Sequence, residues 1–175
     1  MEAVAATNGK VVHHERMVAG RVGEVWELLT TREGLTSFLA PEVRVELSPG
    51  GAFEVLFHPF RPAGLQGGEG CRVLGVDPPR HLRHSWNAPT AFSLVRDRHT
   101  IVDWYLGAEG AGRTRVELYH YGWESGGQWD EAYRYFEDAW AVVLERLDHR
   151  LRHGPVDWEP VLARWAAAVA AGADD

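Results

Sequence analysis

Hydrophobic and polar residues alternate over long parts of the first 120 positions, a pattern that is typical of half-buried β-strands. The segment 42–60 shows it most clearly, because apolar residues recur at every second position on both sides of a Pro-Gly-Gly turn: Val43, Val45, Leu47, Phe53, Val55 and Phe57. This pattern predicts a β-hairpin. Further strand pairs are expected around Asp77-Pro78-Pro79 and around the Gly/Ala loop 107–112, and an edge strand over 11–20.

The spacing of apolar residues becomes helical in four places. Residues 21–31 and Glu33 to Leu39 predict two short helices, the second of which ends before Pro41 because a residue that precedes proline disfavours the helical conformation. A long helix is predicted to begin with a capping box formed by Ser125 and Gln128. Its apolar stripe continues for more than six turns: Trp129, Tyr133, Phe136, Trp140, Val143/Leu144, Leu147 and Leu151.

The fourth helix is expected after Gly154-Pro155, with Asp157 as its cap, while residues 87–95 are expected to be a connecting loop. Strands followed by a separate long helix indicate an α+β fold, in which that helix covers the apolar face of an antiparallel sheet. We expect a disordered leader over 1–10, one domain over 11–153, and an additional helix within the C-terminal extension 154–175.

Composition excludes several classes of protein. The net charge of −7 and the absence of any basic run argue against binding to nucleic acid, which needs a basic surface for the phosphates. The single cysteine, Cys71, cannot form an internal disulfide, which fits a cytoplasmic protein. No signal-peptide pattern is visible at the N-terminus, and no apolar stretch approaches the ~18 residues of a membrane span.

Large aromatic residues are concentrated at positions that should face the space between the sheet and the long helix. They could simply fill a core, since large rings dominate packing. Rigid rings can also leave a gap, and ligand sites are concave, mostly apolar and carry few polar groups. We therefore predict a cavity for a hydrophobic or aromatic small molecule, lined by Phe53, Val55, Phe57, Trp86, Thr100, Val102, Trp104, Leu118, Trp129, Tyr133, Phe136 and Trp140.

Two histidines, His84 and His120, are also expected to point inward. A buried neutral imidazole needs one hydrogen-bond donor and one acceptor, so each could be a core histidine with local partners. The alternative is catalysis, because the pKa of histidine lies near neutrality and suits a general acid or base. His84 and His120 are therefore the candidate catalytic residues.

Other chemistry has little support in the sequence. His149 and His153 are one helical turn apart, but no further ligand pattern accompanies them, so no metal site is predicted. Cys71 has no visible catalytic partner, and no motif for a cofactor is present. The Gly-rich segment 64–70 is expected to be a flexible loop at the mouth of the cavity, and Trp158 and Trp165 to pack on the body or on a second subunit.

The ordered motifs resemble the START-like (SRPBCC) superfamily, and within it the AHSA-type branch, which is named for its similarity to the activator of heat-shock protein 90 ATPase. The resemblance covers roughly residues 11–151 and rests on Gly50-Gly51 between strands, Asp77-Pro78-Pro79 before a strand ending in Trp86, Leu118-x-His120-x-Gly122, and Gly127-x-Trp129-x-x-x-Tyr133. It implies a helix-grip fold, in which a seven-stranded antiparallel sheet wraps around a long C-terminal helix and a cavity for an apolar ligand lies between them.

Three functions are compatible with these features. The first is a module that binds a hydrophobic small molecule. The second is an enzyme on the same scaffold, with aromatase/cyclase-like or hydrolytic activity that uses His84 or His120. The third is a partner-binding protein, although the eukaryotic co-chaperone has an additional N-terminal domain with no counterpart here. A homodimer formed through the terminal helix is compatible with all three.

Overall fold

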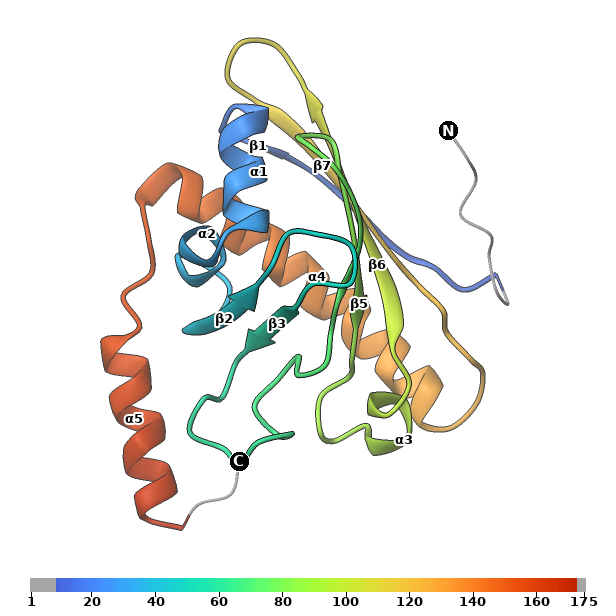
Figure 1. Ribbon diagram of the computed structural model, residues 1–175, viewed down its shortest axis with the longest axis vertical. Coiled ribbons are helices and arrows are strands. Elements are labelled where there is room, and N and C mark those ends of the chain that lie inside the picture. The colour runs from blue at the N-terminus through green and yellow to red at the C-terminus, as the bar shows by residue number, and fades with distance from the viewer. Residues whose placement is uncertain (1–8, 173–175) are drawn as a thin grey trace.

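The computed structural model describes residues 9–172, which contain seven strands and five helices (Figure 1). In chain order they are β1 (Val12–Val18), α1 (Val22–Thr30), α2 (Arg32–Thr36), β2 (Glu42–Val45), β3 (Phe53–Leu56), β4 (Val73–Asp77), β5 (His81–Trp86), α3 (Ser93–Arg96), β6 (Thr100–Ala108), β7 (Thr114–Tyr121), α4 (Gln128–His153) and α5 (Glu159–Ala170). Most of the leader predicted over 1–10 lies outside the described residues.

The seven strands are all antiparallel to their neighbours, but they form two sheets rather than the one that the sequence predicted. Five strands pair in the order β1-β7-β6-β5-β4, while β2 and β3 form a separate hairpin. The long helix α4 lies across one face of the large sheet (Figure 1). This arrangement is the α+β helix-grip architecture expected from the sequence, with a different division of the strands.

The β2–β3 hairpin is still tied to the large sheet by backbone hydrogen bonds. The amide of Gly50 donates to the carbonyl oxygen of Val73 (2.8 Å), and the amide of Phe53 donates to that of Cys71 (2.9 Å). The contact includes only an isolated bridge between Ala52 and Arg72 and does not continue as a regular ladder. The turn before β3 is tight, since a Cβ on Gly51 would lie 2.2 Å from the carbonyl oxygen of Glu46, and only glycine allows this approach.

Strand register places the predicted inward-facing residues side by side on the face that meets α4. His84 and His120 lie on either side of Val102, and Leu82 and Leu118 lie on either side of Trp104. The period-two pattern of the sequence therefore identified the buried face of the sheet correctly. This register also brings the two histidines to opposite sides of one central strand.

The predicted helix caps are wrong in detail. The N-cap of α4 is Gly127, which has no side chain to form a capping box, and the side-chain oxygen of Gln128 instead accepts from the amide of Leu94 (3.0 Å). The N-cap of α5 is Trp158, although Asp157 still accepts from the amide of Glu159 (3.0 Å). The loop predicted over 87–95 runs into α3, and Gln128 fixes the start of α4 to that short helix.

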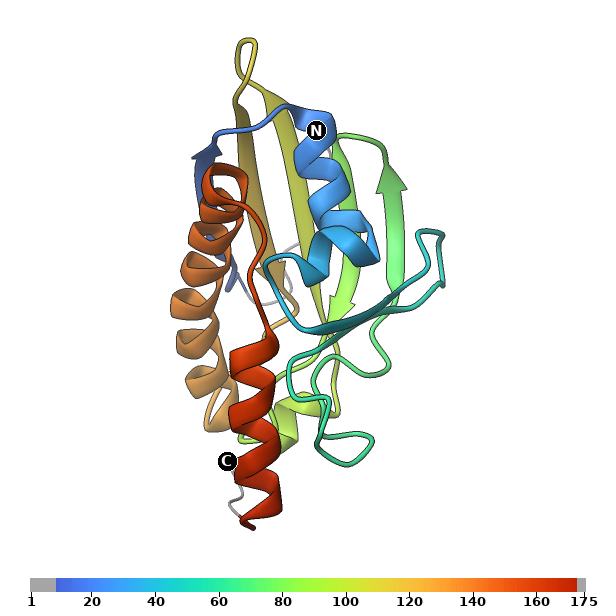
Figure 2. The same ribbon diagram turned by 90° about the vertical axis from the view of Figure 1, so that its left-hand side faces the viewer.

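The terminal helix α5 follows an extended segment after α4, and it lies apart from the first turns of α4 (Figure 1, Figure 2). Two hydrogen bonds hold its beginning on the body: the amide of Val156 donates to the carbonyl oxygen of Ser37 (2.8 Å), and the indole of Trp158 donates to that of Thr36 (2.6 Å). None of the residues of α5 is buried. Within residues 9–172, no helix is both long and apolar enough to cross a membrane.

Candidate ligand-binding pocket

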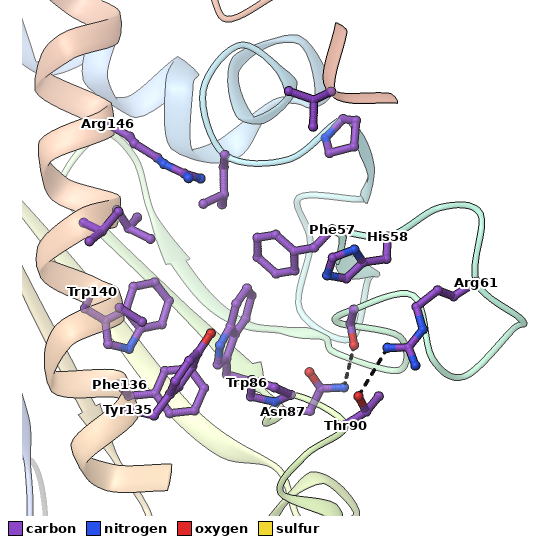
Figure 3. A pocket seen from close by; sticks show the side chains of 18 of the residues that line it. Phe57, His58, Arg61, Trp86, Asn87, Thr90, Tyr135, Phe136, Trp140 and Arg146 are labelled. Carbon is purple, nitrogen blue, oxygen red and sulfur yellow. Dashed lines mark hydrogen bonds between the residues drawn. The ribbon is translucent and has the colours of Figure 1, made fainter. Parts of the chain in front are cut away.

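A cavity of about 750 Å³ lies on the flank of α4, and its lining residues come from α4, α5, the loop after β3 and the segment that follows β5. Figure 3 shows the walls formed by α4, by the loop after β3 and by Trp86 and the residues after it. Its walls are rich in aromatic rings, and four of the eight tryptophans of the chain line it. The aromatic lining residues are Phe57, Trp86, Tyr135, Phe136, Trp140, Trp158 and Trp165. The cavity therefore presents flat apolar surfaces from both the core and the terminal helix.

Trp86, the last residue of β5, is the centre of the aromatic wall. Its ring contacts Phe57 edge to face, with centroids 6.3 Å apart, and Trp140 in a tilted arrangement at 5.4 Å. Each ring is fixed by its neighbours in one of the offset or edge-to-face geometries that aromatic pairs prefer. This part of the wall is pre-formed.

Helix α4 uses two adjacent stripes, one for the core and one for the cavity. Phe136, Trp140 and Leu144 belong to the buried stripe that the sequence predicted. Tyr135 and Val142 lie one position away from that stripe, are 44% and 47% exposed, and line the cavity. Since residues three and four apart share a helix face, residues 135, 139, 142 and 146 form a continuous wall beside the core.

Helix α5 forms the opposite wall. Trp158, Val161 and Trp165 are half-buried, recur at three- and four-residue steps and line the cavity. The ring of Trp165 lies 5.0 Å from that of His58 in the loop after β3. The sequence predicted that Trp158 and Trp165 would pack on the body or on a second subunit, and it missed their place in the pocket. The sequence feature that could have indicated this place is the recurrence of apolar residues at helical spacing, at Trp158, Val161 and Trp165.

The Gly-rich loop 64–70 lies at the rim, where Leu65 and Gly67 line the cavity. Its backbone is held by Glu69, whose carboxylate accepts from the amides of Gly64, Gln66 and Gly67 (each 2.8 Å). Burial raises the pKa of Glu69, but these backbone hydrogen bonds outweigh it and hold the pKa below its usual value. The loop predicted as flexible is therefore an organised rim.

The structure divides the twelve predicted cavity residues into two groups. Phe57, Trp86, Phe136 and Trp140 line the cavity. The other eight lie elsewhere: Trp129 and Tyr133 are half-buried, and the remaining six are buried in the space between sheet and helix, namely Phe53, Val55, Thr100, Val102, Trp104 and Leu118. That space is closed by interlocking rings, such as Trp104 and Trp140 in an edge-to-face contact at 5.7 Å.

His84 is buried in this closed core with both ring nitrogens engaged. Its Nδ1–H donates to the carbonyl oxygen of Ser85 (2.9 Å), and its Nε2 accepts from the indole of Trp104 (3.0 Å). The imidazole also stacks on Phe53, with ring centroids 4.1 Å apart. Burial lowers the pKa of His84 to about 4, so the ring is neutral near pH 7.

His120 is bound in the same way from the other side of β6. Its Nδ1 accepts from the indole of Trp140 (2.8 Å), and its Nε2–H donates to the hydroxyl of Thr100 (2.7 Å). Thr100 in turn donates to the carbonyl oxygen of Trp86 (3.2 Å). Burial holds the pKa of His120 well below its usual value. Neither His120 nor His84 lines the cavity, so the pocket places no substrate beside them.

The residues that could hold a metal or act as a nucleophile are not arranged for that chemistry. Within residues 9–172, no three His, Cys, Asp or Glu side chains gather as ligands. His149 and His153 contact each other at the end of α4, with ring centroids 4.5 Å apart. Burial raises the pKa of Cys71 to about 12, which leaves the thiol protonated and poorly nucleophilic.

The split antiparallel sheet, the long C-terminal helix that it grips and the cavity on the flank of that helix define a START-like helix-grip protein. Residues 21–152 match the family described as Activator of Hsp90 ATPase homolog 1-like protein. Because this match spans most of the chain, the chain belongs to that family. A comparison with curated proteins found no match.

Solved structures with the same fold come from several bacteria. Protein MLL2253 from Mesorhizobium loti is 20% identical, and the alignment covers 84% of this chain and 100% of that chain with a TM-score of 0.67. The Aha1 dimer from Colwellia psychrerythraea is 21% identical, with 83% and 98% covered and a TM-score of 0.61. CalU16 from Micromonospora echinospora is 21% identical, with 93% and 87% covered and a TM-score of 0.59. At these identities the likeness concerns the fold.

Proposed function

We propose that this protein binds a hydrophobic, mainly aromatic small molecule in the cavity between α4 and α5. The observation that carries the proposal is a cavity of about 750 Å³ with seven aromatic side chains in its walls. Pockets for small molecules have volumes of about 300–1,000 Å³ and are lined mainly by apolar and aromatic residues. The ring of Trp86 contacts those of Phe57 and Trp140, so a flat guest meets a surface whose rings hold one another in place.

The geometry does not support an enzyme that uses His84 or His120. An aromatase/cyclase-like or hydrolytic reaction needs an acid or base within reach of the bound molecule. The two histidines that the sequence offered for this role are buried, neutral and hydrogen-bonded on both nitrogens. Their contacts support a structural role, in which each fixes one tryptophan of the core.

A bulky side chain placed in the cavity tests the proposal. Ala139 is half-buried and lines the cavity, whereas Ala141 is exposed, belongs to the same helix and does not line it. Ala139→Trp should therefore weaken binding of the neutral probe 1-pyrenebutanol by about tenfold or more, because an indole would occupy the space of the guest. Titration of probe fluorescence measures the affinity.

Ala141→Trp is the matched control and should bind the probe as the unchanged protein does. Val142→Trp is a second blocking variant from an exposed lining position, which keeps the test valid if Ala139→Trp unfolds. Thermal melting checks the fold of each variant. Equal binding by the blocked and control variants, or no saturable binding at all, would contradict a ligand site between α4 and α5.

A further inference from the structure

Positive charge gathers on the walls of the cavity, although the chain as a whole is acidic. Three arginines line the cavity, Arg61, Arg146 and Arg164, against a single carboxylate, Asp138. The net charge of the protein is −7. Arginine keeps its charge at any pH that a protein experiences, so the cavity carries a local positive potential.

Arg146 and Arg164 have no hydrogen bond or ion pair to any other residue in 9–172. Other arginines near the end of α4 do have partners: Arg150 donates to the hydroxyl of Ser37 (2.8 Å), and Arg152 donates to Asp148 (3.0 Å). Arg146 instead extends from α4 into the cavity, as Figure 3 shows. Its guanidinium is therefore available to a molecule bound there.

The one acidic residue in the walls is too far along α4 to neutralise Arg146. Asp138 and Arg146 are eight residues apart, which corresponds to roughly 12 Å along the helix axis. An ion pair needs its nitrogen and oxygen within about 4 Å. Asp138 therefore forms no ion pair with Arg146.

The polar side chains beside the aromatic wall differ in whether they already have hydrogen-bond partners in the protein. Trp86 is only 5% exposed, yet its indole N–H has no hydrogen-bond partner among the described residues. The side-chain amide of Asn87 is already used on the carbonyl oxygen of Gly67 (3.0 Å), and the hydroxyl of Thr90 accepts from Arg61 (3.3 Å). Beside the carboxylate of Asp138, the cavity leaves the guanidinium groups of Arg146 and Arg164 and the indole N–H of Trp86 as free donors, and a ligand that supplies an acceptor can pair with them.

From these observations we infer that the ligand is an organic anion with a flat apolar body and one carboxylate. The body lies against the rings of Phe57, Trp86 and Trp140. The carboxylate pairs with the two lining arginines that have no partner within residues 9–172, Arg146 of α4 and Arg164 of α5. Guanidinium groups match a carboxylate with two parallel N–H···O hydrogen bonds. This inference rests on the proposed function and specifies the chemistry of its ligand.

Two probes with the same body separate this inference from the proposed function. The neutral probe 1-pyrenebutanol and the anion 1-pyrenebutanoate differ only in the carboxylate. The protein should bind the anion about tenfold more tightly at low ionic strength, and the difference should shrink in 0.5 M NaCl because salt screens partly exposed charges. Fluorescence titrations in both buffers measure the ratio.

Arginine variants then assign the preference to its residues. In the double variant Arg146→Gln, Arg164→Gln, the two probes should bind with equal affinity, because the groups that distinguish the carboxylate from the hydroxyl are gone. The matched control Arg134→Gln, Arg113→Gln removes two exposed arginines that do not line the cavity, and it should keep the preference for the anion. The control therefore accounts for the change in net charge.

Each outcome has a distinct meaning. Equal binding of both probes by the unchanged protein overturns the anionic ligand and leaves the hydrophobic pocket intact. A preference that survives in the Arg146→Gln, Arg164→Gln variant overturns the role of these two arginines. If neither probe binds, the proposed function itself is overturned.

Discussion

Lowering the pH from 7 to 4.5 should reduce the free energy of unfolding by about 2–3 kcal/mol through His84 alone. Burial lowers the pKa of His84 to about 4 in the folded protein, against about 6.5 in the unfolded chain. Between these values the unfolded state binds more protons, so stability falls as the pH falls. His120 is shifted in the same direction by its burial and adds to the loss.

The pH range from 7 to 4.5 separates the effect of the two histidines on stability from that of a buried carboxylate such as Asp103. Burial raises the pKa of Asp103, but hydrogen bonds from Arg83, His81 and Tyr121 outweigh that effect and hold it below its usual value. Its contribution is therefore lost only below about pH 3.9, the unfolded value. Urea unfolding at half-unit steps from pH 7 to 4.5 measures the histidine term. A constant stability across these steps would show that the two rings are not buried and neutral.

Replacing His120 with alanine should destabilise the protein by about 3–5 kcal/mol. The change opens a cavity in the core and leaves the indole N–H of Trp140 and the hydroxyl of Thr100 without their partner. Three elements, α4, β7 and β6, lose a shared hydrogen-bonded connection. Chemical denaturation at pH 7 gives the change in the free energy of unfolding.

Two further variants give this prediction its controls. His99 is exposed and has no such network, so His99→Ala should change stability by about 0.5 kcal/mol or less. Trp140→Phe removes the indole donor, and its effect should not add to that of His120→Ala, with a coupling of about 1 kcal/mol or more. Additive effects, or similar losses for His120→Ala and His99→Ala, would contradict a structural role for His120.

Local patterns were sufficient to predict most of the fold. The alternation that includes Val102, Trp104 and Leu118 identified the buried face of the sheet, because side chains of a strand alternate between faces. The stripe from Phe136 to Leu147 located α4 for the same kind of reason. The division into two sheets was not predictable, because the alternation of apolar residues shows which segments are strands but not whether β3 and β4 pair regularly or only through an isolated bridge.

The sequence pattern could not define the walls of the cavity, because its position depends on contacts between distant parts of the chain. Helical spacing shows which face of α4 is apolar, but not which element covers its flank. That element is α5, whose start is fixed by Trp158 on Thr36, 122 positions earlier in the sequence. Apolar Tyr135 and Val142 beside the core stripe were the clue that a second element lies there.

The roles of His84 and His120 also depend on distant residues that the sequence pattern does not identify. The pattern showed that His84 and His120 point inward, and it left open a core role or a catalytic one. The choice depends on whether their ring nitrogens have partners in the protein. The indoles of Trp104 and Trp140 supply those partners from other elements, and only the folded arrangement brings them within hydrogen-bond distance.

The tryptophan indoles offer a direct test of the proposed ligand site. Trp86, Trp140, Trp158 and Trp165 line the cavity, whereas Trp26, Trp104, Trp123 and Trp129 do not. In ¹⁵N-labelled protein, titration with 1-pyrenebutanol should shift the indole N–H resonances of the first four and leave the other four unchanged. Shifts of Trp104 and Trp123 alone would place the ligand inside the sheet–helix core, and no shifts at all would contradict a binding site between α4 and α5.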